Sequence, residues 1–417
     1  MSAWWKENEK DVFCKVITFL VNPLLGFFYS LRRLNTKSSF YIIALFSLTF
    51  GIAFSTPDRR TDLFTIDAAD YRANFENYTN KGTQYFLWQL ESYVTFSDKS
   101  DFYGDTVNFL VSRVTDNYHV LFFVLAFVFT FFSLKSLKLF VQEDNFKSSL
   151  PCFILLYLFL SNQIFNINAY RFYTALAVTV YSILSYFVKR EHKYLLYLIL
   201  AAFMHGTFFI LVPLSLIYIF FGKYVRFWSV CVVVCFFISS ISIELFNSFI
   251  PFLPTSLADK YDGYLSAMYV YKINEAGNEN MMLKRFLELC CRTYINIMVL
   301  VMILNYKPHI KDTKCEKMFH FLLVVMSFVN FTMMIPSLGS RFLMLALPFI
   351  AYVWLVCFSE KKFRKYVYVL GIMFLLLIPV PVQILQLPCL KYYLKVLEPE
   401  FYLTSPFYLF LKYTVFY

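Results

Sequence analysis

Long hydrophobic runs alternate with short polar loops along this chain, and many of the loops are basic. A helix needs roughly 20 mostly apolar residues to cross a bilayer, and most of the runs approach that length. The pattern therefore predicts an all-α polytopic membrane protein with about 10–12 transmembrane helices. The expected spans lie at 39–56, 118–134, 150–166, 172–188, 194–221, 227–246, 288–305, 319–335, 342–358 and 366–386.

The run at 194–221 differs from the others because it is too long for one crossing and too short for two full ones. Cytoplasmic loops of membrane proteins carry an excess of Lys and Arg. All the basic loops can face the cytoplasm only if this run crosses an even number of times. We therefore predict a short broken or re-entrant hairpin around His205, which a membrane tolerates only where the irregular backbone is buried in protein or lines a cavity. The basic loops lie at 32–37, 135–138, 189–193, 223–226, 307–317 and 360–365.

This topology divides the chain into three parts. The first is a cytoplasmic N-terminus whose apolar stretch is expected to form an interfacial helix, with an extra span as the less favoured alternative. The second is the transmembrane domain, and the third is an aromatic external tail whose end is too short to span and is expected in the interface. The parts are residues 1–38, residues 39–386 with external loops at 57–117 and 247–285, and residues 387–417.

Composition supports a membrane location and argues against two other classes of protein. Hydrophobic residues make up 59% of the chain and charged residues only 16%. The net charge of +11 lies mostly in short loops, as topology signals do, so we expect no nucleic-acid partner. The nine cysteines lie mostly in apolar segments. We expect them to be small buried hydrophobes rather than a zinc site or a disulfide framework.

Three polar residues lie at or inside apolar runs: Arg171, His205 and Arg341. A charge at membrane depth costs several kcal/mol unless it is paired or faces a wet cavity, so such residues are functional candidates. Each also has a structural interpretation. Arg171 can be a snorkelling helix cap, His205 a packing histidine inside the bundle, and Arg341 an anchor at the outer face.

Amide and tyrosine side chains precede Arg171, namely Asn166, Asn168 and Tyr170. Together with an arginine they provide donors and acceptors for hydroxyl-rich and anionic groups. They are therefore candidates for binding a sugar or a pyrophosphate.

Two more sets of candidates lie farther along or outside the membrane. Arg285 and Arg292 share a helical face in LKRFLELCCRTY, where the alternative is a solvated charge ladder. In the external loop at 57–117, Asp70 is a candidate because a carboxylate there can act as a general base for a hydroxyl nucleophile, and Tyr71 is a candidate for binding the substrate.

These residues together predict an outward-facing membrane cavity with arginines, a histidine, amides and aromatic rings. Arginine binds phosphate and pyrophosphate bidentately, and aromatic rings suit the apolar faces of sugars. A lipid pyrophosphate that carries a glycan has both features. The chain shows no zinc-protease, nucleophile-elbow or phosphate-loop motif, and we expect neither a metal nor a cofactor.

The order of these features resembles the EpsG-like, or Wzy-like, bacterial polysaccharide polymerases. The resemblance covers roughly residues 40–360. It rests on early Arg and Asp elements, an Arg that opens a helix, a basic loop, a helix with a midpoint His, and a late SRFLMLALPFIAY. The early element reads TIDAADY and departs from the family's usual Gly-Asp-Thr pattern. The matching residues are Arg59, Arg60, Asp67, Asp70, Tyr71, Arg171, His205 and Arg341.

The resemblance implies glycosyl transfer between lipid-linked repeat units on the periplasmic face of a bacterial inner membrane. Arg171, Arg341, Arg292 and Arg285 would bind the pyrophosphate, and His205 or Asp70 would orient or deprotonate the acceptor hydroxyl. The expected partners are the lipid-linked oligosaccharide and membrane lipid, and a chain-length regulator and a flippase stay open as further partners.

Three alternatives stay open at this stage. A flippase or exporter of lipid-linked glycans would need charges lining both membrane halves. A membrane O-acyltransferase that modifies glycans would place its histidine near a cytosolic entrance. A structural scaffold would not explain the polar residues at depth.

Overall fold

The computed structural model confirms the predicted fold class. Within the described residues all regular structure is helical, and three helices are long and apolar enough to cross a membrane. Several shorter apolar helices accompany them. The expected spans at 150–166 and 366–386 lie outside the described residues, as does most of the external loop at 247–285. The structure describes residues 7–56, 67–97, 99–143, 146, 167–238, 244–245, 248, 250–253, 255, 258–259, 281–309, 313–335, 338–358 and 398–415.

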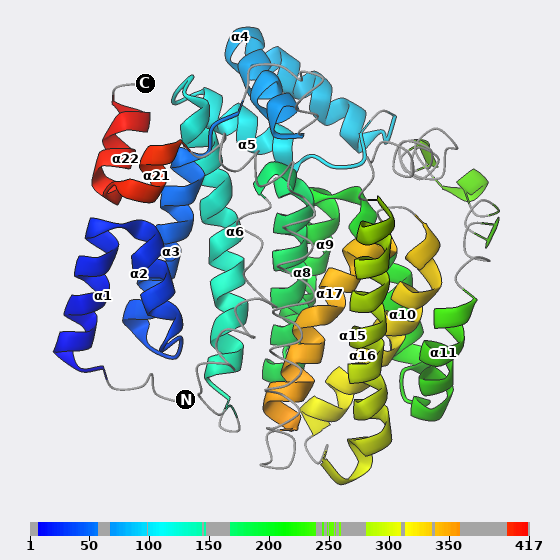
Figure 1. The fold of residues 1–417 in the computed structure, drawn as a ribbon. Helices are drawn as coiled ribbons and strands as arrows, with labels where there is room; N and C mark the ends of the chain where they lie inside the picture. Colours follow the sequence, from blue (N-terminus) through cyan, green and yellow to red (C-terminus); the bar gives the residue numbers. More distant parts are fainter. Residues whose placement is uncertain are drawn as a thin grey trace.

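Most helices stand side by side in one bundle, and α4 and α5 lie across one end of it (Figure 1). We call this end the capped end. The bundle helices are α3 (Lys37–Ala53), α6 (Tyr118–Val141), α8 (Tyr170–Lys189), α9 (Leu196–Met204), α10 (Leu211–Phe221), α11 (Val225–Phe237), α15 (Met281–His309), α16 (Thr313–Phe331) and α17 (Gly339–Tyr352), and the capping helices are α4 (Asp67–Val94) and α5 (Tyr103–Ser112).

The segment around His205 forms the broken hairpin that the topology predicts. His205 has an extended backbone (φ −155°) and separates α9 from the short 3-10 helix η3 (Gly206–Ile210), which leads into α10. The Ser182 hydroxyl donates to the Tyr194 carbonyl (2.7 Å), and the ring of Tyr218 lies 5.7 Å from that of Phe187. Both ends of the hairpin therefore lie along the far half of α8, while His205 lies at the capped end.

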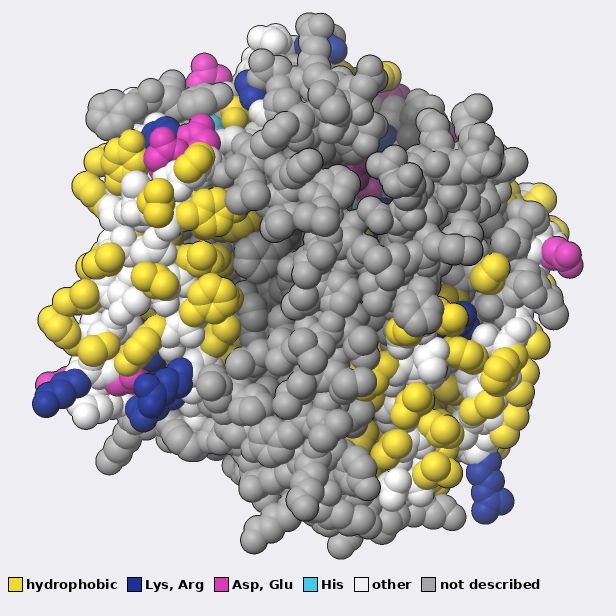
Figure 2. Space-filling model, in the orientation of Figure 1, with side chains coloured by type: hydrophobic (Ala, Val, Ile, Leu, Met, Phe, Trp, Pro, Cys, Tyr) yellow, Lys and Arg dark blue, Asp and Glu magenta, His cyan; other side chains and the backbone are white. Residues whose placement is uncertain are grey.

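Two helical pairs from the chain termini pack on the same flank of the bundle. Helices α1 (Glu9–Val21) and α2 (Pro23–Leu31) pack on α3, and α22 (Pro406–Thr414), which follows α21 (Pro399–Leu403), contacts α3 and α6. Asn22 caps α2 and its amide donates to the Tyr402 carbonyl (2.7 Å), which joins the two pairs. The stretch expected as one interfacial helix is thus two helices in the structure. Figure 2 shows hydrophobic side chains over this flank, as lipid contact requires.

A buried ion cluster ties the N-terminus to the start of α3. Lys15 is 1% exposed and lies 3.0 Å from both Glu7 and Asp11. Its ammonium also donates to Thr36 and Ser38. Burial alone would raise the pKa of Glu7, but hydrogen bonds from Ser38 and Lys15 outweigh it and lower that pKa.

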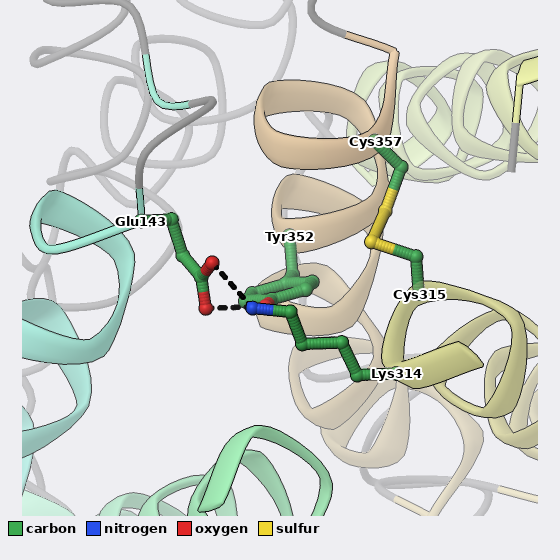
Figure 3. The surroundings of a disulfide bond; sticks show 5 residues. All are labelled: Glu143, Lys314, Cys315, Tyr352 and Cys357. Atoms are coloured by element: carbon green, nitrogen blue, oxygen red, sulfur yellow. Dashed lines mark hydrogen bonds and ion pairs between the residues drawn. A yellow bond between two sulfur atoms is a disulfide. The ribbon is translucent and has the colours of Figure 1, made fainter. Parts of the chain in front are cut away.

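The expectation for the cysteines is wrong for one pair, because Cys315 and Cys357 form a disulfide with a Cα–Cα distance of 6.2 Å. It joins the start of α16 to the π-turn that follows α17. Beside it, Glu143 accepts from Lys314 (2.7 Å) and from Tyr352 (2.7 Å), so α6 is bound to the same two helices (Figure 3). The antiparallel packing of α16 and α17 brings the two sulfurs together, which spacing along the chain does not reveal.

Candidate functional site

The first turn of α8 meets the capping helices, and an ion pair joins them there. Arg171 Nη1 lies 2.9 Å from Asp101 Oδ1, in the segment just before α5. The Asp101 side chain is only 7% exposed, whereas the Arg171 side chain is 39% exposed. One carboxylate therefore fixes one end of the guanidinium, while Nε is buried and another part of the side chain stays exposed.

Tyrosine rings pack against this ion pair. The guanidinium carbon of Arg171 lies 5.3 Å from the centre of the Tyr71 ring, a cation–π contact. Tyr71 contacts Tyr170 edge-on at 4.5 Å, and Tyr103 lies 5.9 Å from Tyr170. Burial raises the pKa of the Tyr71 phenol, and the neighbouring guanidinium offsets only part of that shift. At neutral pH Tyr71 is therefore a neutral phenol and not a phenolate that could accept a proton.

A glycine lets the first turn of α8 approach α5 closely. A Cβ atom at Gly104 would lie 2.6 Å from the hydroxyl oxygen of Tyr170 and 3.4 Å from Cδ of Arg171. Any other residue at this position would displace the tyrosine. Gly104 therefore positions Tyr170, and through it Arg171.

His205 and Arg341 both pack against the ring of Phe172, in the first turn of α8. The Phe172 ring lies edge-on to the His205 ring at 5.4 Å, and the guanidinium carbon of Arg341 lies 5.2 Å from its centre. The structure thus gathers the three polar residues that interrupt apolar runs around the first turn of α8.

The fold also adds backbone dipoles to this region. Arg171 and Arg341 lie in the first turns of α8 and α17, and neither helix has a side-chain hydrogen bond at its N-cap. A helix N-terminus attracts anions, because its dipole adds about half a positive charge there. Two arginines and two helix N-termini at one end of the bundle form an environment suited to a phosphate or pyrophosphate.

His205 is buried, and its ring caps the helix that follows. The Thr207 N–H donates to His205 Nδ1 at 3.4 Å. A nitrogen that accepts this bond carries no proton, so the proton of the neutral ring lies on Nε2. Just after it, a Cβ at Gly206 would lie 2.7 Å from the Ser100 carbonyl oxygen, so the turn packs closely on the segment that holds Asp101.

A second carboxylate lies next to the ion pair. Asp105 accepts from the Tyr78 hydroxyl (2.6 Å) and pairs with Lys99. Burial and the bond to Asp105 raise the pKa of Tyr78 well above its ordinary value. Sequence reasoning missed Asp101 and Asp105, and the one signal for them was the pair of acids four residues apart in DFYGD, at the start of a helix.

The other predicted residues have different places. Asp70 is exposed on α4, one residue before Tyr71. Asn168 is half-buried just before α8. Asn166 and the side chain of Arg285 lie outside what the structure describes, as do Arg59 and Arg60.

Arg292 belongs to a second polar cluster. It donates to the carbonyls of Phe236 (2.8 Å) and Asn330 (3.3 Å), and its guanidinium stacks on the Phe236 ring at 4.3 Å. Asn330 in turn exchanges hydrogen bonds with Asn296. These contacts join α15 to α11 and α16, and carbonyl oxygens engage part of the guanidinium.

A metal site was not expected, and among the described residues no group of three or more His, Cys, Asp or Glu side chains lies close enough to bind a metal ion. The groups that this part of the protein brings together are guanidinium groups, a histidine and carboxylates.

Comparison with known proteins identifies the family most directly. A model of the EpsG family matches residues 38–394. This range is most of the chain and contains every candidate residue discussed above. Neither a curated protein nor a solved structure gives a significant match.

Proposed function

This chain belongs to the EpsG family, which is linked to exopolysaccharide biosynthesis, and we propose that it polymerises lipid-linked oligosaccharide repeat units. The donor is a glycan on a polyprenyl pyrophosphate, and the acceptor is a second lipid-linked unit. The reaction takes place at the capped end of the bundle, which we assign to the outer face of the membrane because the basic loops lie at the other end. This protein is thus a Wzy-like polymerase in our proposal.

The observation that supports this function best is the Arg171–Asp101 ion pair of 2.9 Å at the N-terminus of α8, with Arg341 across the Phe172 ring. Glycosyl transfer breaks the bond between the donor's anomeric carbon and a pyrophosphate oxygen. Negative charge then develops on that oxygen, and fixed guanidinium groups stabilise it without reorganising. Asp101 orients Arg171 for this role.

The acceptor hydroxyl forms the new bond to the anomeric carbon and loses its proton. His205 Nδ1 already accepts from a backbone N–H, so we assign the histidine a positioning role through Nε2–H. The proton goes to a carboxylate, and Asp70 is our candidate because it is exposed beside Tyr71.

Aromatic rings on α4 suit the glycan itself. Trp88 is 56% exposed, and its ring lies 5.9 Å from that of Tyr85. Exposed aromatic faces stack on the apolar faces of sugars. We propose that the growing glycan leaves the site along this helix.

Deletion of the gene, followed by mass spectrometry of the polyprenyl-linked glycans and their membrane sidedness, tests this function. We expect single repeat units to accumulate on the outer leaflet and long polymer to disappear. Units trapped on the cytoplasmic leaflet would identify a flippase instead, and full-length polymer that lacks only acyl groups would identify an O-acyltransferase.

Complementation of the deletion strain then tests the site. Arg171→Ala should give no long polymer. Because it also leaves the buried Asp101 unpaired, polymer is compared per amount of membrane protein, and Arg171→Lys, which keeps a positive charge beside Asp101, should make little long polymer at a normal protein level. Arg226→Ala is the matched control, because Arg226 is an exposed arginine at the start of α11, away from the capped end. Long polymer from Arg171→Ala would contradict the assignment of the site.

A further inference from the structure

An apolar groove runs between α3 and α6 on the outside of the bundle. Its volume is about 260 Å³. The two helices touch closely near the capped end, where a Cβ at Gly51 would lie 2.6 Å from Cβ of Ala126. Away from that contact the groove opens between side chains of both helices, including Phe40, Ala44, Leu48, Phe127, Phe131 and Leu134.

The length of the groove matches one leaflet of a bilayer. Its wall on α3 runs from Leu48 to Phe40, eight residues apart, which is about 12 Å of helix. Half of the hydrocarbon core of a bilayer is about 15 Å. The groove therefore covers most of the length of the hydrocarbon chain of a single lipid in the leaflet away from the capped end.

Two lysines of α6 line the end of the groove that lies farther from the capped end. Lys135 and Lys138 both line it and are both exposed. Lys135 Nζ lies 4.9 Å from the centre of the Phe131 ring, so its stem follows the groove wall. In this conformation the Lys135 ammonium lies one turn back toward the capped end, and rotation of its long side chain carries it to the headgroup region. The two lysine charges complement an anionic headgroup.

We propose that this groove is a binding site for one anionic glycerophospholipid of the leaflet at the lysine end, which the basic loops mark as cytoplasmic. The chain lies along α3 and α6, and the phosphate lies between Lys135 and Lys138. The site is separate from the proposed catalytic site, because Lys135 follows the capped end of α6 by about 25 Å. The proposal does not depend on the polymerase function.

The polyprenyl pyrophosphate substrate fits this groove poorly. Its pyrophosphate must reach Arg171 at the capped end, where Arg72 stacks over Tyr118 at the start of α6 (4.1 Å). The lysines lie at the other end of the same helix. A lipid whose headgroup contacts them therefore belongs to the opposite leaflet from the reacting substrate.

Photo-crosslinking in lipid vesicles tests the site. The full chain is reconstituted in phosphatidylcholine vesicles that contain a trace of photoreactive phosphatidylglycerol or, separately, photoreactive phosphatidylcholine. We expect labelled peptides from α3 and α6 with at least a fivefold preference for phosphatidylglycerol. Each lysine near an anionic headgroup raises the affinity for that lipid roughly fivefold. Equal labelling by both lipids would overturn the proposal.

Three variants distinguish binding of the lipid in the groove from non-specific attraction by positive charge on the protein surface. Lys135→Gln with Lys138→Gln should remove the preference. Lys193→Gln with Lys223→Gln, which changes two exposed lysines outside the groove, should leave it intact. Ala44→Phe should fill the groove and reduce labelling while both lysines remain.

Equal losses in the two lysine pairs would overturn the proposal, because they would mean surface attraction only. So would displacement of the label by polyprenyl phosphate at lower concentrations than by unlabelled phosphatidylglycerol. In that case the groove would be a site for the polyprenyl lipid. Circular dichroism of each variant verifies that it is folded.

Discussion

Arg171 and Asp101 form an ion pair of 2.9 Å between positions 70 residues apart in the sequence. The arginine opens a bundle helix and the aspartate lies in the segment before α5, so the pair couples the membrane domain to the helices that cap it. Asp101 is the more buried partner, and leaving it unpaired is costly because a buried charge loses its compensation.

Asp101→Asn replaces the charge-assisted bond to Arg171 by a weaker neutral one, so it should destabilise the protein and also misplace Arg171. A hydrogen bond between charged groups contributes about 1.5–3 kcal/mol. We expect a lower melting temperature in detergent and reduced polymer length in cells. In a double-mutant cycle with Arg171→Ala the two losses should be strongly non-additive, and fully additive losses would contradict a direct coupling between the residues.

Gly104→Ala should impair the site through Tyr170. The added Cβ would lie 2.6 Å from the tyrosine hydroxyl, and overpacking of this kind costs about 1–3 kcal/mol. Tyr170→Phe removes that oxygen, so the double variant should recover much of the stability and activity that Gly104→Ala loses. Thermal unfolding and polymer length measure both effects, and a double variant no better than Gly104→Ala would exclude this clash as the cause.

The disulfide between Cys315 and Cys357 should be detectable and stabilising in protein purified without reductant. Both cysteines lie beside basic loops that we assign to the cytoplasm, where the reducing environment keeps thiols reduced in the cell. It closes a loop with a sequence separation of 42, and bonds of this kind typically contribute about 2–4 kcal/mol. The Cys315→Ser, Cys357→Ser double variant should unfold at a lower temperature than the wild type. Cys231→Ser is the control, since Cys231 is a free thiol. Alkylation of both Cys315 and Cys357 in the unreduced, unfolded protein would show that the bond is absent.

Glu7 should make stability depend on pH in the acidic range. Its pKa is lowered from 4.5 in the folded protein by hydrogen bonds from Ser38 and Lys15, which outweigh the effect of burial. The carboxylate therefore contributes stability above pH 4.5, and the contribution disappears as the pH falls through the lowered pKa. The melting temperatures of wild type and Glu7→Gln should differ at pH 7 and converge at the acidic end. A difference that persists unchanged at low pH would contradict this linkage.

The sequence alone singled out the polar residues that interrupt its apolar runs. His205, Arg171 and Arg341 stand out because each interrupts or opens an apolar run, and the even-crossing argument located the hairpin at His205. From the sequence we expected these residues to line one cavity but could not name their contacts. The structure shows that the ring of His205 and the guanidinium of Arg341 both contact the ring of Phe172.

Other features depend on packing between distant segments and leave little trace in the sequence. Asp101 lies among several other charges in an external segment, and only the fold shows that it pairs with Arg171. The partner of Cys315 depends on how α16 packs on α17. The division of the N-terminal stretch into α1 and α2 had a local signal, because Asn22-Pro23 is a helix cap followed by the preferred first helical residue.

We propose that this protein itself joins lipid-linked repeat units, without the help of another enzyme. The most direct measurement uses the purified full chain in vesicles with the polyprenyl-pyrophosphate-linked repeat unit from the deletion strain as the one glycan substrate. We expect a ladder of products that differ by one repeat unit each, with release of free polyprenyl pyrophosphate, and neither product from Arg171→Ala. Unchanged monomeric repeat units after incubation with folded wild-type protein would contradict it.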